Sequence, residues 1–219
     1  MDDPALKAES HERALKGLAR INQISGTAKE IWRELQQHVN PGDKVKMLDI
    51  ATGGADVPIE VLKIARQFGI TIELTVCDIS ERALEWAQQR ADAFDLSIST
   101  FVLDVCKEDI PNQFQIVTSS LFLHHLDRDQ AQAVLRRMGD AASGLTLVND
   151  LERSVLGYCA ALAASQLLTR SPIVHTDAPR SVRAAYTKQE ASDMARDAGL
   201  RNVQVRRCRP FRWQLTSKP

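Results

Sequence analysis

From Val45 onward, short apolar runs alternate with amphipathic helical segments, and this alternation constrains the fold more than any other feature. The apolar runs are VKMLDI, IELTVCD, ISTFVLD, FQIVTSS and LTLVND. The clearest helices between them are expected at residues 58–68, 81–94 and 129–141. Apolar strands separated by helices are typical of a parallel sheet that is covered on both faces. The pattern therefore predicts an α/β fold.

The pattern changes after the LTLVND run. A helix is expected at 154–168, followed by an irregular stretch at 171–186. Thr187 and Glu190 have the spacing of a capping box, ahead of a helix that ends at Gly199.

Two further runs, VQVRRC and FRWQL, lie on either side of Pro210, which suggests an antiparallel hairpin at the edge of the sheet. We therefore predict a Rossmann-like sheet of seven strands, mostly parallel with the last strand antiparallel, and with helices on both faces.

The residues ahead of the first strand have a helical pattern. Apolar side chains recur at three-residue steps at Leu15, Leu18, Ile21 and Ile24. A second helix is expected at 27–39, before the Asn-Pro-Gly-Asp turn. We expect residues 1–44 to form a helical N-terminal segment ahead of a domain of residues 45–219, with residues 151–186 as a helical insert.

Composition excludes several classes of protein. The 28 basic residues balance 28 acidic ones, which argues against a nucleic-acid binder. The four cysteines form no C-x-x-C pair, so we expect reduced thiols and no metal. No apolar run reaches about 18 residues, and the N-terminus has no apolar signal region. We expect a cytoplasmic protein without a membrane span, a monomer or a homodimer.

The segment MLDIATGGADVP is the most informative motif, because a strand runs through a glycine-bearing turn into a helix. A dinucleotide fingerprint would need glycine at positions 51 and 56 as well as at Gly53, but the chain has Ala51 and Asp56 there. Asp56 would repel a pyrophosphate at the start of the helix, and Asp49 adds a second negative charge. The loop therefore predicts a ligand that lacks a diphosphate and carries positive charge.

Two more carboxylates follow later strands. Asp78 ends the second strand, where a carboxylate suits the paired hydroxyls of a ribose, although it could instead cap the helix that follows Ser80. Asp104 ends the third strand and is placed to accept a hydrogen bond from an exocyclic amine. With Asp49, these carboxylates share the edge at which open α/β sheets bind ligands.

Taken together, these motifs resemble those of class I S-adenosylmethionine (SAM)-dependent methyltransferases. MLDIATGGAD, VCDIS, FVLDV and FQIVTSSLFLHHL match the family's first four motifs. The resemblance implies SAM as the cofactor, with Asp78 at the ribose, Asp104 and Val105 at the adenine, and Ser119 and Ser120 beside the methionine portion. The cofactor-binding positions that it implies are Asp49, Ala51, Thr52, Gly53, Asp56, Asp78, Ile79, Asp104, Val105, Ser119 and Ser120.

The chain departs from the family at two positions. Ala51 stands where the family usually has glycine, and alanine is tolerated there if its φ is negative. Gln115 stands where the family often has aspartate, and we do not expect it to touch the cofactor.

Candidates for the chemistry follow the fourth and fifth strands. A general base is needed only if the acceptor arrives protonated, as a phenol does. His124 and His125 follow the fourth strand and Asp150 ends the fifth, so we predict that His124 acts as a base and that Asp150 orients it. The alternative is that the histidine pair shapes the pocket.

The resemblance also implies that residues 1–44 form an N-terminal helical lid over a methyltransferase domain of residues 45–219, and that the insert at 151–186 forms part of the acceptor pocket. The insert offers candidate contacts for a substrate. They are Arg153, Tyr158, His175, Arg183 and Tyr186. The alternative for each is an ordinary surface residue.

We expect methylation of a small molecule, most simply O-methylation of a phenolic or polyketide-type metabolite, because the lid layout and the HHL motif resemble those of secondary-metabolite and quinone methyltransferases. C- or N-methylation of a quinone-like or other small acceptor stays open, as does a SAM-binding regulator without turnover. A nucleic-acid methyltransferase is disfavoured by the zero net charge and by SSLFL in place of an N/D-P-P-[YF] segment.

Overall fold

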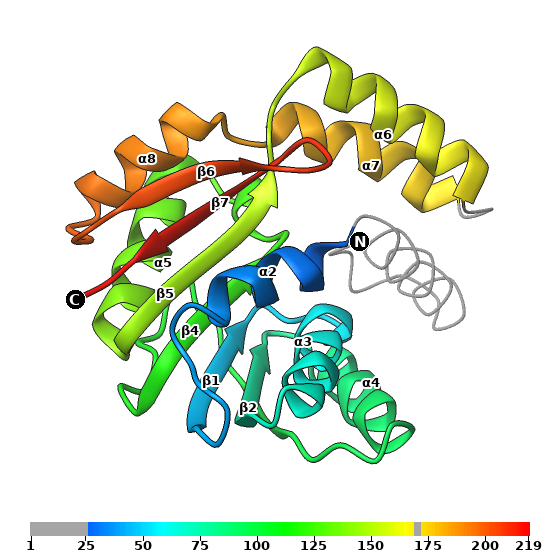
Figure 1. Cartoon of the computed structure of the whole chain (residues 1–219). Coiled ribbons are helices and arrows are strands. Elements are labelled where there is room, and N and C mark those ends of the chain that lie inside the picture. Colours follow the sequence, from blue (N-terminus) through cyan, green and yellow to red (C-terminus); the bar gives the residue numbers. More distant parts are fainter. Residues whose placement is uncertain (1–25, 169–171) are drawn as a thin grey trace.

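The computed structural model of the chain describes residues 26–168 and 172–219 (Figure 1). The first expected helix, with Leu15, Leu18, Ile21 and Ile24, lies outside these residues, as does most of the expected lid. The strands are β1 (Lys44–Ile50), β2 (Thr71–Asp78), β3 (Ser99–Val102), β4 (Phe114–Ser120), β5 (Ala142–Leu151), β6 (Gln204–Cys208) and β7 (Arg212–Ser217). The helices are α2 (Thr27–Leu35), α3 (Asp56–Gln67), α4 (Glu81–Asp92), the short 3₁₀ turn η1 (Leu123–His125), α5 (Arg128–Ala141), α6 (Val155–Leu168), α7 (Pro172–Ala184) and α8 (Lys188–Asp197).

The strands of the described residues form one seven-stranded sheet in the order β3-β2-β1-β4-β5-β7-β6. The first five strands in this order pair in parallel, whereas β7 runs antiparallel to both β5 and β6. The predicted seven-stranded Rossmann-like fold with an antiparallel last strand is therefore confirmed. The hairpin across Pro210 places β6, and not β7, at the outer edge.

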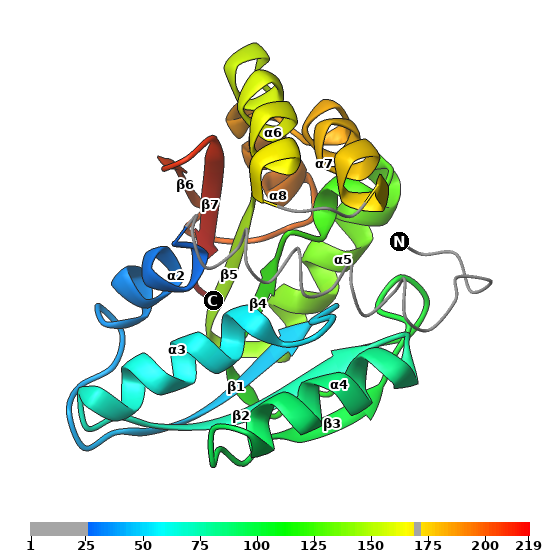
Figure 2. The same cartoon turned by 90° about the vertical axis from the view of Figure 1, so that its right-hand side faces the viewer.

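Helices cover both faces of the sheet (Figures 1 and 2). Alternate side chains of β1 enter two separate cores, as expected for a strand that is buried on both faces. Met47 joins a core with α2, α3 and α4, and Leu48 joins a core with α5 and α8. The carboxyl ends of β1, β2, β4 and β5 thereby emerge at one edge between the two layers.

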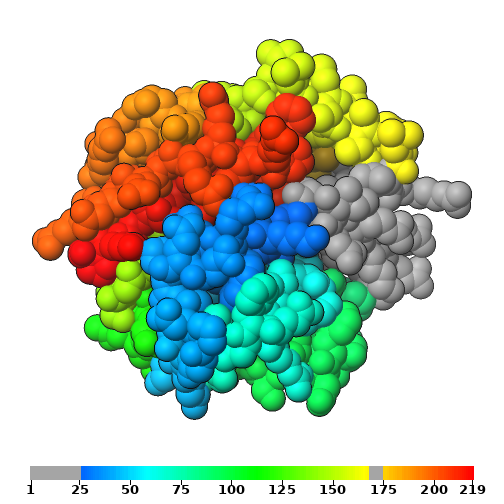
Figure 3. All heavy atoms as spheres, in the orientation of Figure 1, coloured from blue at the N-terminus to red at the C-terminus, as the bar shows by residue number. Residues whose placement is uncertain are grey.

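Helix α2 belongs to this packing, although it lies within the range expected for the lid. Ile31, Trp32 and Leu35 are buried against α3 and the sheet. On its other side, Glu30 pairs with Arg206, and Glu34 accepts from the Gln214 amide at 3.3 Å. Figure 3 shows the blue α2 segment between the β6–β7 hairpin and the cyan α3.

Local sequence signals set several helix starts. Ser80 caps α4 by accepting from the Ala83 N–H. The predicted capping box of Thr187 and Glu190 starts α8 and is confirmed. Asp127 and Gln130 form a second capping box that starts α5.

Two expectations were wrong. The stretch 171–186, expected to be irregular, contains helix α7. Proline suits the first turn of a helix, and packing of α7 against α6 and η1 outweighs the cost of Pro179 inside it. Strand β5 begins at Ala142, directly after α5, and not near Leu145. At Gly144 the strand passes close to β4, because an added Cβ would lie 3.0 Å from the Gln115 carbonyl oxygen.

Candidate functional site

The loop between β1 and α3 has three residues with left-handed backbone. Ala51, Gly53 and Ala55 have φ values of 49°, 55° and 52°. The condition given for alanine at position 51, a negative φ, is therefore not met. Within this turn the Thr52 N–H donates to the Cys77 carbonyl of β2 at 3.1 Å. Alanine in this region is strained by about 1–2 kcal/mol, so the loop holds its shape against a local cost.

Glycine at position 54 is required by a close approach. A Cβ there would lie 2.8 Å from the Trp86 ring of α4. The loop therefore packs directly on α4 and leads into α3, which begins at Asp56.

Asp78 is bound to this loop. One of its carboxylate oxygens accepts from the Gly53 N–H at 2.8 Å, and the other accepts from the Ser80 N–H at 3.0 Å. Asp78 is therefore not the cap of α4, a role that Ser80 has. Each carboxylate oxygen keeps a further lone pair for a hydroxyl donor. Ile79 beside it is 66% exposed, which leaves an apolar surface next to a polar one.

Asp49 is buried at the end of β1. Its carboxylate accepts from the Thr118 hydroxyl at 2.7 Å and from the Thr52 hydroxyl at 2.8 Å. Burial raises the pKa of Asp49 to about 7, and the charges of Asp56 and Asp78 add to the rise, against these two hydrogen bonds. The first carboxylate of the motif therefore titrates near neutral pH.

The two serines that end β4 differ. Ser119 is fully buried, and its hydroxyl faces the Ile50 carbonyl at 3.5 Å. Ser120 is half-buried and pairs with Asn149 of β5. Gln115, at the other end of β4, accepts from the Lys46 N–H at 2.7 Å, away from the carboxyl edge.

Asp104 lies just beyond β3. Its carboxylate accepts from the Cys106 N–H at 3.1 Å and pairs with Lys107 at 2.8 Å. The Lys107 ammonium lowers the pKa of Asp104. Val105 next to it is buried.

His124 and Asp150 meet at the carboxyl edge, as their positions after β4 and β5 predicted. The His124 Nδ1 lies 2.6 Å from one Asp150 oxygen, and the His124 backbone N–H donates to the other at 3.2 Å. Both side chains are buried. Burial alone would raise the pKa of Asp150, but the charge and hydrogen bond of His124 hold it below its usual value. An ionised Asp150 fixes the Nδ1 proton of the imidazole and leaves Nε2 for a ligand.

Of the five candidate substrate contacts, Arg153 and Tyr186 are direct neighbours, since the Arg153 backbone N–H donates to the Tyr186 carbonyl at 3.3 Å. Arg153 pairs with Glu190 at 2.5 Å, and the Tyr186 hydroxyl donates to the Leu126 carbonyl at 2.7 Å. Both groups thus connect the insert to its surroundings. Arg183 is exposed on α7, and Tyr158 and His175 are half-buried on α6 and α7.

Two buried polar residues at the same edge, Asn149 and Arg212, were not predicted from the sequence to belong to the site. Burial lowers the pKa of Arg212 to about 10, while the carboxylates of Asp150 and Asp56 oppose the fall. Neither residue belongs to a motif. Arg212 stood within the FRWQL run, which indicated a strand and nothing more.

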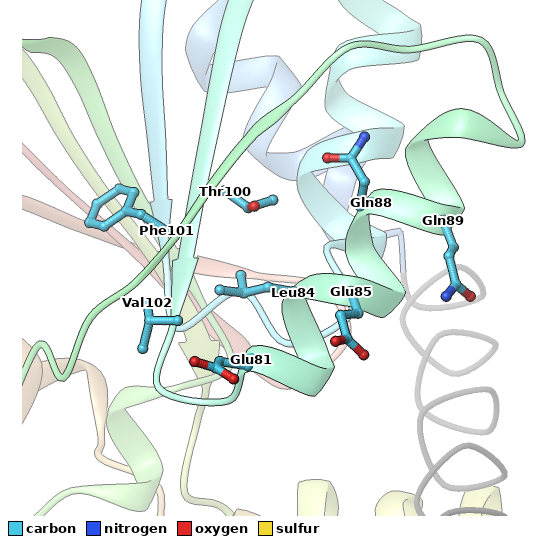
Figure 4. A pocket seen from close by; sticks show the side chains of 8 residues that line it. All are labelled: Glu81, Leu84, Glu85, Gln88, Gln89, Thr100, Phe101 and Val102. Atoms are coloured by element: carbon cyan, nitrogen blue, oxygen red, sulfur yellow. The ribbon is translucent and has the colours of Figure 1, made fainter.

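A separate hollow of about 530 Å³ lies between α4 and β3 (Figure 4). It is lined by Glu81, Leu84, Glu85, Gln88, Gln89, Thr100, Phe101 and Val102. It contains no predicted site residue, so we place the candidate site at the carboxyl edge instead. Within the described residues, no group of His, Cys, Asp and Glu side chains could hold a metal ion, and no helix is long and apolar enough to cross a membrane.

The comparisons with known proteins concern the family and the fold. Residues 47–143 match the family described as a methyltransferase domain. A SAM-dependent methyltransferase from Aquifex aeolicus has a TM-score of 0.62 and 15% identity, covering 87% of this chain and 88% of that one. Magnesium protoporphyrin IX methyltransferase from Synechocystis PCC 6803, with bound SAH, has a TM-score of 0.63 and 15% identity, covering 99% of this chain and 89% of that one.

A candidate O-methyltransferase from Nostoc punctiforme PCC 73102 has a TM-score of 0.65 and 19% identity, and the match covers 90% of this chain. The chain spans only 57% of the length of that protein. No curated protein sequence matches the chain. At these identities the likeness establishes the fold, which is that of class I methyltransferases.

Proposed function

We propose that the chain transfers a methyl group from SAM to a small molecule, most simply to a phenolic or polyketide-type hydroxyl. The match of residues 47–143 to the methyltransferase domain family and the likeness of the fold to that of a SAM-dependent methyltransferase support the proposal. When bound, SAM supplies an electrophilic methyl group on a sulfonium. The observation that carries the choice of a hydroxyl is the buried His124–Asp150 pair at the carboxyl edge.

The residues of the edge fit this cofactor. The Asp78 carboxylate has free lone pairs for the ribose hydroxyls, and the exposed Ile79 offers an apolar surface to the adenine. Asp56 supplies negative charge on the side where a sulfonium and an ammonium are expected, and Asp49 adds to it when ionised. A diphosphate is disfavoured at the start of α3, because the negative charge of Asp56 there would repel it.

His124 is the proposed general base. Its Nε2 removes the proton of the acceptor hydroxyl, while ionised Asp150 holds Nδ1 and stabilises the imidazolium that forms. Burial of both groups excludes water from the proton transfer. The proton leaves the imidazolium for solvent after the methyl group has been transferred.

The test is turnover of a phenol library, followed by pH–rate profiles of the wild type, His124→Ala and Asp150→Asn. We expect His124→Ala to lose about 10²- to 10⁴-fold in turnover at neutral pH, with partial recovery at high pH where a phenol ionises unaided. SAM affinity should change little. His38→Ala, beyond the end of α2, is the control and should keep the wild-type profile.

Three results would contradict the proposal. Turnover within about threefold of wild type in His124→Ala would leave alignment and desolvation, without a base, as the source of the rate. Turnover only on carbon or nitrogen acceptors would replace the hydroxyl, and tight SAM binding without turnover on any acceptor would favour a regulator. It stays a prediction that the protein is cytoplasmic, that it is a monomer or a homodimer, and that it does not act on nucleic acid.

A further inference from the structure

Two side chains at the carboxyl edge are buried without hydrogen-bond partners. Both amide atoms of Asn149 and the Nη1 of Arg212 lack a partner in the described part of the chain. Asn149 is fully buried, and Arg212 is 4% exposed. A buried polar group without a partner is costly, so native proteins rarely leave one without a reason.

These groups lie on one face of the sheet. Asn149 is paired with Ser120 of β4 on one side and with Gln214 of β7 on the other, and Arg212 is paired with Leu151. Paired residues point to the same face, so Arg212 and Asn149 are diagonal neighbours on the face that α2 and α3 cover. A polar row therefore runs from Ser120, beside the β1 loop, through Asn149 to Arg212.

The row contains a buried charge that no ion pair of residues 26–168 and 172–219 neutralises. Asp150 and Asp56 act on Arg212 through the electric field, but neither forms an ion pair with it. The guanidinium stays protonated at neutral pH. A cation held in this way favours an anion that can bind its free N–H groups.

The set of free atoms matches one chemical group. Arg212 Nη1 and the Asn149 amide nitrogen are two donors for a carboxylate, and the Asn149 oxygen is an acceptor for an ammonium. An α-amino acid carries both.

We propose that Asn149 and Arg212 bind the amino-acid end of SAM, at the opposite end of the site from the adenosine at Asp78. The inference rests on the proposed function and names two residues that the motifs do not contain. It also explains why these polar atoms are buried beside Ser120.

The test compares two thioethers by isothermal titration calorimetry. S-adenosylhomocysteine carries the amino-acid end, and 5′-methylthioadenosine has the same adenosine and sulfur without it. Arg212→Gln should weaken S-adenosylhomocysteine binding by about 10- to 100-fold, as expected for a hydrogen bond to a charged group. Its affinity for 5′-methylthioadenosine should stay as in the wild type.

Two further variants protect the test against misfolding. Asn149→Asp keeps the shape of the side chain but places a carboxylate beside Arg212, so it should fold and still bind S-adenosylhomocysteine at least about tenfold more weakly. Arg209→Gln removes the same charge from an exposed position on the same hairpin and should bind both compounds as the wild type does. Thermal unfolding checks that each variant is folded.

The outcomes separate the two proposals. Unchanged S-adenosylhomocysteine affinity in folded Asn149→Asp or Arg212→Gln overturns the inference and leaves the methyltransferase proposal intact. An equal loss for both compounds also overturns it, because the effect would then be on the whole site. A wild-type protein that binds neither compound contradicts the proposed function itself.

Discussion

Among single residues, Asp49 couples the site to pH. Its pKa is raised by burial from the usual 3.8 to about 7 in the folded protein, so between these values the folded state holds a proton that the unfolded state has lost. Stability must therefore be highest below about pH 4 with respect to this group, and must fall as pH rises to about 7.

Asp49→Asn removes this titration, so the wild type should lose stability relative to the variant from pH 4 to pH 8 and level off above that range. Urea unfolding of both proteins across this range measures the difference. A difference that does not vary with pH would show that Asp49 is ionised throughout.

Ala51 is the second residue with a defined local cost. With φ at 49°, its Cβ is strained, whereas glycine adopts this conformation freely. Ala51→Gly should raise the free energy of unfolding by about 0.5–1 kcal/mol after the larger entropy of an unfolded glycine is subtracted.

The matched control is Ala93→Gly, an exposed position with φ at −62°. It should lose about 0.5–1 kcal/mol, because glycine gains nothing there. If both substitutions destabilise equally, the left-handed strain at Ala51 is too small to measure.

At the scale of elements, α2 is a structural part of the sheet's covering layer. Leu35 is 1% exposed in the core it shares with α3 and β1. Leu35→Ala should lower the free energy of unfolding by about 2–5 kcal/mol, measured by urea unfolding. The exposed Lys29→Ala on the same helix should stay within about 0.5 kcal/mol of wild type. Similar values for the two would mean that α2 is undocked in solution.

The contact between the β1 loop and α4 can be tested in the same way. Gly54→Ala forces a Cβ into the Trp86 ring and should cost about 1–3 kcal/mol of stability. The cost should shrink in a Trp86→Ala background, where the ring is gone, and this difference is the coupling energy of a double-mutant cycle. Additive costs would show that the loop moves away from α4 easily.

For the whole molecule, alternating apolar runs and helices were enough to predict the sheet and its closing hairpin. The helix at α7 was missed because Pro172 and Pro179 read locally as breaks. Its formation depends on packing against α6 and η1, with Val182 buried, and that is information from distant segments.

The site residues also differ in whether local sequence or distant pairing brings them to the site. Asp49, Asp78, His124 and Asp150 could be found because each lies at or just beyond the carboxyl end of a strand, and the ends of parallel strands share an edge. Arg212 could not, because it reaches the site only through the pairing of β7 with β5, about 60 residues earlier in the chain.

The place of β7 has a consequence for how the molecule is assembled. β6 is made before β7, yet it touches the sheet only through β7. While the chain is being synthesised, β5 therefore presents an open row of backbone groups, and β6 has no strand to join until β7 arrives. The buried Trp213 enters the core in the same event. Until β7 pairs with it, the edge of β5 is the surface on which a chaperone or a second nascent chain would compete with the hairpin.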